Sequence, residues 1–247
     1  MSVLTLRLAG PLQSWGASAR FVRRTTEAAP TKSGVIGVLA AAQGLERGDD
    51  TGLARLAALR FGVRIDQPGT RVRDFQTAHH AVTGKSMPLS ERFYLADAVF
   101  VAAVEGDSAL VEELHACLRA PVFLPYLGRR SCPPVLPLEL NVRHDVDIEG
   151  ALREEPWQAA RWYQNLRRRD ERVPLAVLRE TVATDPGADV LRDQPLSFAT
   201  EHRRHGLRTV VSSGVEVPNP MAARARRAGS RTVPSHEPLV PLEEDAL

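Results

Sequence analysis

The order of strand and helix patterns along this chain restricts its fold more than any other feature of the sequence. Residues 3–8 alternate leucine with other side chains, which is typical of a strand with one buried face. Gly10 and Pro11 break this strand, and a basic loop is expected over residues 13–30. The patterns that follow this loop decide the fold class.

Helical patterns come directly after the basic loop. The spacing of apolar residues predicts a helix over 33–42, with Ser33 as its candidate N-cap, and a second helix over 52–59. Apolar residues then predict a strand over 61–66. The first strand is therefore followed by helices and then by another strand.

Two extended segments come next, over residues 70–82 and 91–104, joined by a loop that contains turn residues. We interpret them as one long hairpin. Asp107 or Ser108 is expected to cap a further helix that ends before Pro121. The order strand, helix, strand, hairpin, helix predicts an α+β fold of the ferredoxin-like (RNA-recognition-motif-like) type.

The second half of the chain carries weaker patterns. Residues 121–137 are rich in proline, and strands are expected over 136–146 and 173–183 around a helix over 151–166. From residue 218 onward the apolar periodicity stops, which predicts a mobile tail. The chain thus divides into three parts: a main domain over 1–137, a smaller β-rich C-terminal extension over 138–217 that completes the fold, and the tail over 218–247.

Length and composition exclude several classes of protein. The chain has 247 residues, 43% hydrophobic and 25% charged, so it can bury a core without disulfides or metals. Its two cysteines, Cys117 and Cys132, belong to no CxxC motif, which argues against a structural zinc site. No apolar run approaches the roughly 20 residues that span a bilayer, and residues 1–10 lack a secretory signal pattern. We therefore expect a cytoplasmic protein with no membrane contact and no cofactor.

Basic charge is unevenly distributed along the chain. Among the 32 basic residues, only Lys32 and Lys85 are lysine. GC-rich codon usage explains such a bias, and so does recognition of phosphates and bases by planar guanidinium groups. Basic residues gather in segments 1–40 and 199–232, whereas the end of the chain is acidic. This polarity is typical of proteins that bind a polyanion.

The histidines do not form an evident metal site. His79 and His80 are adjacent, so in a strand their side chains face opposite directions. His202 and His205 have the i,i+3 spacing that suits a metal on a helix, but no third ligand accompanies them. We therefore expect no metal.

The hairpin carries residues for two kinds of chemistry. Residues 79–86 resemble the end of a phosphate-binding P-loop, but His79 replaces the first glycine of that motif. Metal-free RNA cleavage needs a general acid and a general base, and Tyr94, Lys85, His79 and His80 share this hairpin. Their spacing shows no convergence of two such groups, so we favour surface or packing roles and keep cleavage as an alternative.

Five sequence blocks follow one another in the first 137 residues. They are LRLAGPLQSWG at 6–16, PTKSGVIG at 30–37, RDFQT at 73–77, RFYLADA at 92–98 and PYLGRRSCP at 125–133. In this order they resemble the CasD family, the family-five subunit of the type I-E CRISPR complex Cascade. The last block is the most specific, and the resemblance is weak beyond residue 137.

This resemblance implies a function in antiviral defence. Such subunits cap the 5′ handle of the CRISPR RNA and contact the backbone subunit and the large subunit of Cascade, so any contact with target DNA would be indirect. It also implies a ferredoxin-like palm with a hairpin thumb, which we place at about 70–104 because family blocks fall on both strands. In type I-E complexes another subunit cleaves the precursor RNA, and no catalytic residue is therefore expected.

The candidate RNA-binding residues combine the resemblance with chemistry. Ser33 begins a helix whose free N–H groups can bind a phosphate, and Gly34 and Gly37 would permit close approach. Arg129 and Arg130 can bind phosphates or stack on bases. The residues expected to contact RNA are Trp15, Arg20, Arg23, Arg24, Lys32, Ser33, Arg73, Gln76, His79, Arg129 and Arg130.

Two alternatives stay open at this point. In some other CRISPR subtypes the family-five protein is itself a metal-independent endoribonuclease that processes precursor CRISPR RNA. A generic basic RNA-binding or scaffold domain would show the same charge distribution without any CRISPR specificity.

Overall fold

Four neighbouring strands form one end of the main sheet in the computed structural model, which describes residues 1–16 and 23–222. They are β1 (Ser2–Ala9), β4 (Arg60–Gln67), β7 (Val99–Gly106) and β8 (Glu139–His144). Their order in the sheet is β4-β7-β1-β8, and each neighbouring pair is antiparallel. Every residue of β7 is buried, so this strand forms the middle of the core. The expected α+β class is confirmed.

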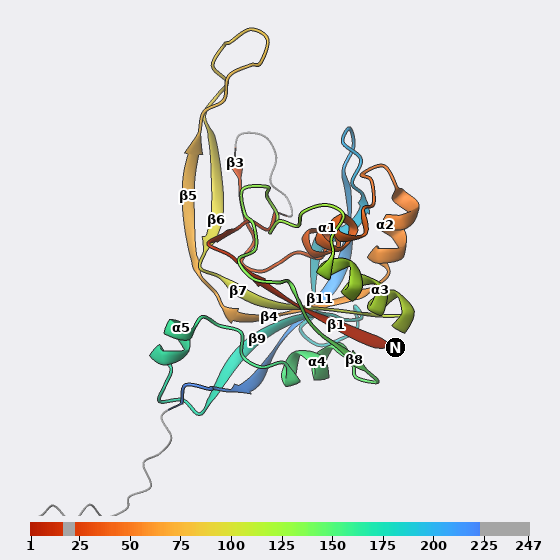
Figure 1. Cartoon of the computed structure of the whole chain (residues 1–247), viewed down its shortest axis with the longest axis vertical. Coiled ribbons are helices and arrows are strands. Elements are labelled where there is room, and N and C mark those ends of the chain that lie inside the picture. Colours follow the sequence, from red (N-terminus) through yellow and green to blue (C-terminus); the bar gives the residue numbers. More distant parts are fainter. Residues whose placement is uncertain (17–22, 223–247) are drawn as a thin grey trace, which may run out of the picture.

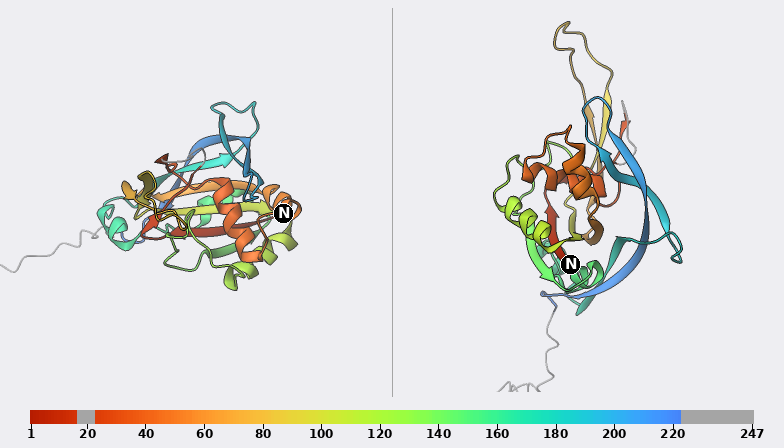
Figure 2. Two further views of the ribbon diagram at one scale, coloured as in Figure 1. Left: turned by 90° about the horizontal axis from the view of Figure 1, so that it is seen from above. Right: turned by 90° about the vertical axis from the view of Figure 1, so that its right-hand side faces the viewer.

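Helices cover both faces of this sheet (Figures 1 and 2). On one face α1 (Lys32–Gln43), α2 (Asp50–Ala57) and α3 (Ser108–Arg119) pack in one apolar cluster. On the other face α4 (Ile148–Glu154) packs in a second cluster, and the short helix α5 (Arg161–Leu166) follows it. None of the helices within the described ranges is long and apolar enough to cross a membrane.

Strand β1 is buried on both faces, whereas the alternation of its residues predicted one buried face. Leu4, Leu6 and Leu8 face the cluster of α1, α2 and α3. Val3 belongs to the second cluster, and Thr5 on the same face is also fully buried. The prediction of a half-buried strand is therefore wrong, because α4 and the segment after it cover the face that would otherwise meet water.

The hairpin is shorter than the sequence predicted. It consists of β5 (Thr70–Gln76) and β6 (Ser90–Ala96), paired from Thr70–Ala96 to Gln76–Ser90. The chain turns at Asp97, which has a left-handed φ of 54°, and then enters β7 of the main sheet. Residues 91–104 are therefore not one strand, because the apolar second half of this segment is buried in the core. Figure 1 shows the hairpin extending well beyond the sheet.

The basic loop after β1 is tied to the hairpin. Strand β2 (Leu12–Gln13) pairs with β6 in antiparallel orientation, and β3 (Arg23–Arg24) pairs with β6 in parallel orientation. Together with β5 they form a second, smaller sheet. These pairings place the arginines of β3 beside Glu91 and Arg92, at the end of β6 that is nearer the hairpin tip.

The C-terminal strands extend the main sheet rather than form a separate layer. They are β9 (Arg172–Glu180), β10 (Asp189–Ser197) and β11 (Arg204–Pro218), in the order β10-β11-β9 next to β4. Strand β9 pairs with β4 only at Gly62–Arg64, and beyond this contact the sheet curves until β10 packs against α1 and α2 (Figure 2). The sequence predicted β9 but neither β10 nor β11, and β10 reverses the usual pattern because it exposes Val190, Leu191 and Leu196 and buries Asp193.

Three further predictions need correction or fall partly outside the structure. The N-cap of α1 is Thr31, whose hydroxyl accepts a hydrogen bond from the Gly34 N–H, and Ser33 lies within the first turn. The single helix expected over 151–166 is divided into α4 and α5 with Pro156 between them. Most of the tail expected from residue 218 lies outside the described residues.

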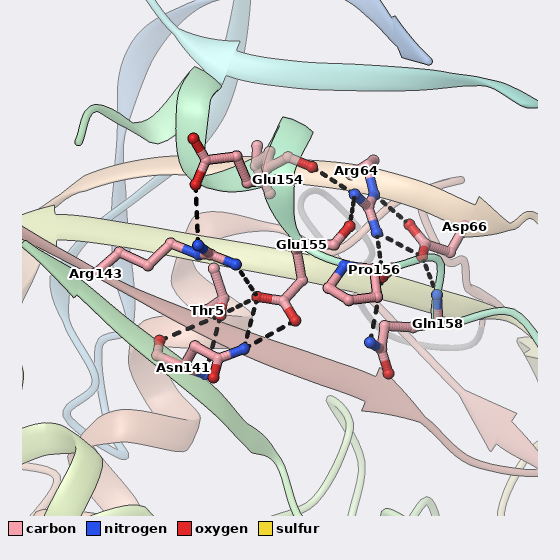
Figure 3. A network of polar contacts seen from close by, with 10 residues as sticks. Thr5, Arg64, Asp66, Asn141, Arg143, Glu154, Glu155, Pro156 and Gln158 are labelled. Atoms are coloured by element: carbon pink, nitrogen blue, oxygen red, sulfur yellow. Dashed lines mark hydrogen bonds and ion pairs between the residues drawn. The ribbon is translucent and has the colours of Figure 1, made fainter. Parts of the chain in front are cut away.

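A buried ion pair holds the connection between α4 and α5 (Figure 3). The Arg64 guanidinium, fully buried, donates to both carboxylate oxygens of Asp66 at 2.7 and 2.8 Å. It also donates to the carbonyl oxygens of residues 152, 155 and 156. Burial raises the pKa of the Asp66 carboxyl, and the contact with Arg64 opposes this rise. Arg64 therefore joins β4 to a segment without regular structure.

Replacement of Arg64 by leucine leaves Asp66 and three carbonyl groups buried without their donor. We expect Arg64→Leu to lower the free energy of unfolding by about 3–5 kcal/mol, measured by urea denaturation. Arg153→Leu is the control, because it removes an exposed i,i+4 ion pair with Glu149 and costs at most about 1 kcal/mol. Equal losses in the two variants would show that the Arg64 contacts do not stabilise the fold.

Candidate nucleic-acid interface

Trp15 is a core residue that positions the basic loop. Its side chain is fully buried, and the indole N–H donates to the side-chain oxygen of Gln13 at 3.0 Å. A Cβ on Gly34 would lie 2.7 Å from the indole, so only glycine fits at this place on α1. Gln13 in turn donates to the carbonyl oxygens of Leu8 and Ala98. Trp15 therefore has a structural role, and its expected contact with RNA stays a prediction.

The proline-rich loop over 121–137 packs against Ser14, next to Trp15. Gly128 has a left-handed φ of 85°, and a Cβ there would lie 1.7 Å from the Ser14 carbonyl oxygen. The Ser14 N–H donates to the Leu127 carbonyl, and the Leu127 N–H donates to the Cys132 carbonyl. These contacts close a turn that presents Arg129 and Arg130 next to the basic loop.

The N-terminus of α1 is occupied by the protein itself. The backbone N–H of Lys32 donates to the Asp193 carboxylate at 2.8 Å, and the Lys32 ammonium pairs with Glu180 at 2.8 Å. Arg208 binds Asp193 as well, and burial lowers the pKa of Lys32. Asp193 is therefore the anion at this helix end. We correct the expectation that Lys32 and Ser33, both buried, meet an RNA phosphate.

Six arginines surround a cavity of about 390 Å³ beside strand β6 of the hairpin, which we call the arginine pocket. They are Arg24, Arg47, Arg92, Arg129, Arg130 and Arg203, and the remaining lining residues are Tyr126, Gly128 and Ser131. The arginines come from five segments on the upper side of the molecule in Figure 1: β3, the α1–α2 connection, β6, the loop over 121–137 and the turn before β11. No carboxylate lines this pocket within the described part of the chain.

The pocket holds guanidinium groups whose hydrogen-bonding capacity is not filled. Arg129 lies 4.6 Å from the ring centroid of Tyr94, and its Nη2 donates to the Arg24 carbonyl at 2.9 Å. Its buried Nη1, like the buried Nε of Arg92, has no hydrogen-bond partner among the described residues. Buried donors without a partner are costly, and an anion in the pocket would satisfy them.

The remaining predicted residues lie along the hairpin, apart from the pocket. Arg23 lies 5.4 Å from the Phe93 ring centroid, and Arg73 lies 4.8 Å from that of Phe75. Gln76 donates to Asp74 at the end of β5, and the His79 ring contacts the Gly84 carbonyl within the hairpin tip. Arg73, Phe75 and Phe93 share one face of the hairpin, which we call the aromatic strip, whereas Gln76 lies on the opposite face. Arg20 lies outside the described residues.

Sequence comparison places the chain in a known family. The family described as "CRISPR-associated protein (Cas_Cas5)" matches residues 3–211. The chain belongs to this family. The CRISPR system Cascade subunit CasD of Escherichia coli (strain K12) is 34% identical over 169 residues, which cover 61% of this chain and 75% of that protein. The resemblance to the CasD family, inferred from five sequence blocks, is confirmed.

Solved structures of the same kind share the fold. A chain of a structure described as "CRISPR RNA-guided surveillance complex" superposes with a TM-score of 0.72 at 35% identity, covering 91% of this chain and 95% of that one. A structure described as "Crystal structure of Cas protein" gives a TM-score of 0.66 at 34% identity, with 90% and 98% covered. The similarity therefore includes the C-terminal strands, where the sequence blocks are weak.

Sequence reasoning missed three of the six pocket arginines. Arg92 begins the RFYLADA block, so its place in a family motif was an available signal. Arg203 lies in the basic segment 199–232, which was noted for charge alone. Arg47 carried no signal, because it lies in the α1–α2 connection and only the folding of α1 brings it to the pocket.

The helical metal site considered for His202 and His205 does not form. His205 belongs to strand β11 and His202 precedes it, so the i,i+3 spacing does not place them on one helix face. In the described parts of the chain, no three His, Cys, Asp or Glu side chains gather where they could hold a metal ion.

Proposed function

We propose that this family member is a non-catalytic CRISPR RNA-binding subunit of a type I-E Cascade complex, which caps the 5′ handle of the guide RNA. The arginine pocket is the observation that carries this proposal. Its six guanidinium groups meet where the family blocks pack together, and none of the residues that line the pocket in the described part of the chain carries a carboxylate. Two relatives support the same function, since the E. coli protein is a Cascade subunit and the similar structure is an RNA-guided surveillance complex.

The chemistry of the pocket and the strip fits single-stranded RNA. Proteins bind such RNA through backbone charge and through stacking of bases on aromatic or guanidinium planes. The pocket supplies cations for phosphates, and the hairpin supplies Phe75 and Phe93 with an arginine beside each ring. Because Arg92 and Phe93 are adjacent in β6, the pocket and the strip lie on opposite faces of the hairpin, and an RNA that contacts both must pass around its edge.

We further propose a ferredoxin-like palm with a hairpin thumb. The chain order β1, α1 and α2, β4, β7, α3, β8 and the sheet order β4-β7-β1-β8 support the palm, since they match a split βαβ arrangement. The thumb is the β5–β6 hairpin with its tip at 77–89, and it would reach the neighbouring backbone subunit. The large subunit would contact the palm, and the complex would work in the cytoplasm with only indirect contact to target DNA.

The arrangement of the hairpin residues does not favour the endoribonuclease alternative. The rings of His79 and His80 contact backbone groups of the hairpin tip itself. Tyr94 is buried beneath Arg129, and it lies on the order of 13 Å along β6 from Ser90, where the tip begins. Tyr94 is therefore remote from His79, His80 and Lys85, which share the tip, and cannot act with them at one phosphate.

Salt dependence tests the arginine pocket. Affinity for a 5′-handle RNA should fall with salt by a log–log slope of about −0.7 per phosphate contact. Replacing Arg129 and Arg130 by alanine should weaken binding and make the slope about 1.4 less steep. The matched control, Arg168→Ala with Arg169→Ala, removes an equal charge from the exposed end of α5 and should leave the slope nearly unchanged. A slope that is the same for both variants would place the RNA elsewhere.

Shortening the hairpin tests the thumb. Gln76 and Ser90 lie opposite each other, so an Asn-Gly turn can replace residues 77–89. This variant should unfold at the same urea concentration as the wild type, because the tip is exposed, but it should enter the complex less efficiently. Size exclusion with the other subunits measures assembly, and Gly-Ser in place of residues 183–186 is the control turn. Normal assembly of the 77–89 variant would refute the thumb.

Incubation with labelled precursor CRISPR RNA separates binding from cleavage. We expect the purified chain to release no product, with or without a chelator. His79→Ala and His80→Ala should also leave the RNA content of assembled complexes unchanged, since the ring of each contacts backbone groups of the hairpin tip. A handle-bearing product that disappears in either variant would establish the nuclease function instead.

A further inference from the structure

A second cavity, of about 850 Å³, opens into the arginine pocket along α1, and we call it the α1 groove. The two cavities share Arg47, Tyr126, Gly128, Arg130 and Arg203. Beyond these shared residues the groove is mainly apolar, lined by the side chains of Val38, Leu45, Leu53, Phe123, Leu124 and Phe198. One continuous surface therefore has a cationic half and an apolar, aromatic half.

Gly37 on the floor of the groove is not explained by packing. A Cβ on Gly37 would meet only Phe198, at the ordinary contact distance of 3.8 Å. This differs from Gly34, where the Trp15 indole leaves no space for a Cβ. Glycine in the middle of a helix lowers stability relative to alanine. A glycine that costs stability without a packing reason indicates that the space above it is kept open for a ligand.

We propose that the α1 groove binds one unstacked base of the RNA whose phosphates lie in the arginine pocket. This inference rests on the proposed RNA binding, and it adds that a base of the RNA is bound as well as its phosphates. The size of the groove lies within the range of small-molecule sites, and its aromatic walls offer planes for a base. The neighbouring arginines would hold the phosphates on either side of that base.

The walls of the groove also offer polar groups for the edge of a base. Ser14, Thr31 and Glu46 line it, and His205 lies on the side of β11. Asp49 lines it too, but its side chain caps α2 through the Gly52 N–H. A carboxylate such as that of Glu46 accepts hydrogen bonds from exocyclic amino groups, which favours adenine, guanine or cytosine over uracil.

Abasic RNA tests this proposal. A set of 5′-handle RNAs, each lacking one base, is compared with intact RNA for binding to the full chain. One position should lose at least about tenfold in affinity, the range of a base stacked in a protein site. Gly37→Leu should bind intact RNA with a similarly reduced affinity. Removal of the sensitive base from the RNA should then lower the affinity of this variant little further. Gly37→Ala adds a single methyl group to the same space and should show a smaller loss than Gly37→Leu.

Other outcomes separate this inference from the proposed function. If the wild type does not bind handle RNA at all, the proposed function itself is wrong. If it binds and no single base matters, or if Gly37→Leu keeps the same abasic sensitivity, the base lies elsewhere and the inference is wrong. Loss of complex assembly in Gly37→Leu with unchanged RNA binding would assign the groove to a protein partner. If Gly37→Leu does not fold, Phe123→Ser is measured in its place, because Phe123 is a half-exposed residue in the wall of the groove. This variant must reduce the difference in affinity between intact RNA and the sensitive abasic RNA.

Discussion

The packing of the Trp15 indole against α1 at Gly34 is the contact on which the nucleic-acid interface depends. It holds residues 13–16 across the first turns of the helix, and the Ser14 carbonyl then meets Gly128. Because neither glycine leaves space for a side chain, the basic loop and the proline-rich loop can take only one relative position. That position brings Arg24, Arg129 and Tyr94 into contact.

Arginine has two different tasks in this molecule. Inside the fold, Arg64 and Arg208 bind carboxylates with their planar guanidinium groups, and Arg64 also satisfies three backbone carbonyls. In the arginine pocket, the same group stacks on an aromatic ring and keeps donors that no described residue fills. The number of arginines in a sequence therefore says little about nucleic-acid binding. An arginine that lies beside a carboxylate in the fold stabilises the structure, whereas one without such a neighbour can bind a phosphate.

The C-terminal strands are part of the candidate site. By curving over α1 and α2, β10 brings Asp193 to the N-terminus of α1 and Phe198 to the α1 groove. The turn before β11 adds Arg203 to both cavities. An interface that the sequence predicted within residues 1–137 is thus completed by residues after 190. The similarity to solved structures over about nine-tenths of the chain agrees with one fold for both halves.

The sequence by itself determined the fold class, the family and the turn that carries Arg129 and Arg130, because local patterns and contiguous motifs encode them. It also separated the hairpin from the helices, although it made the hairpin too long. Only the tertiary structure decided that Trp15 and Lys32 are buried while Arg47, Arg92 and Arg203 share a pocket. The reason is physical: exposure and charge pairing depend on the carboxylates and apolar faces that long-range packing brings near, such as Glu180 and Asp193, which lie far away in the sequence.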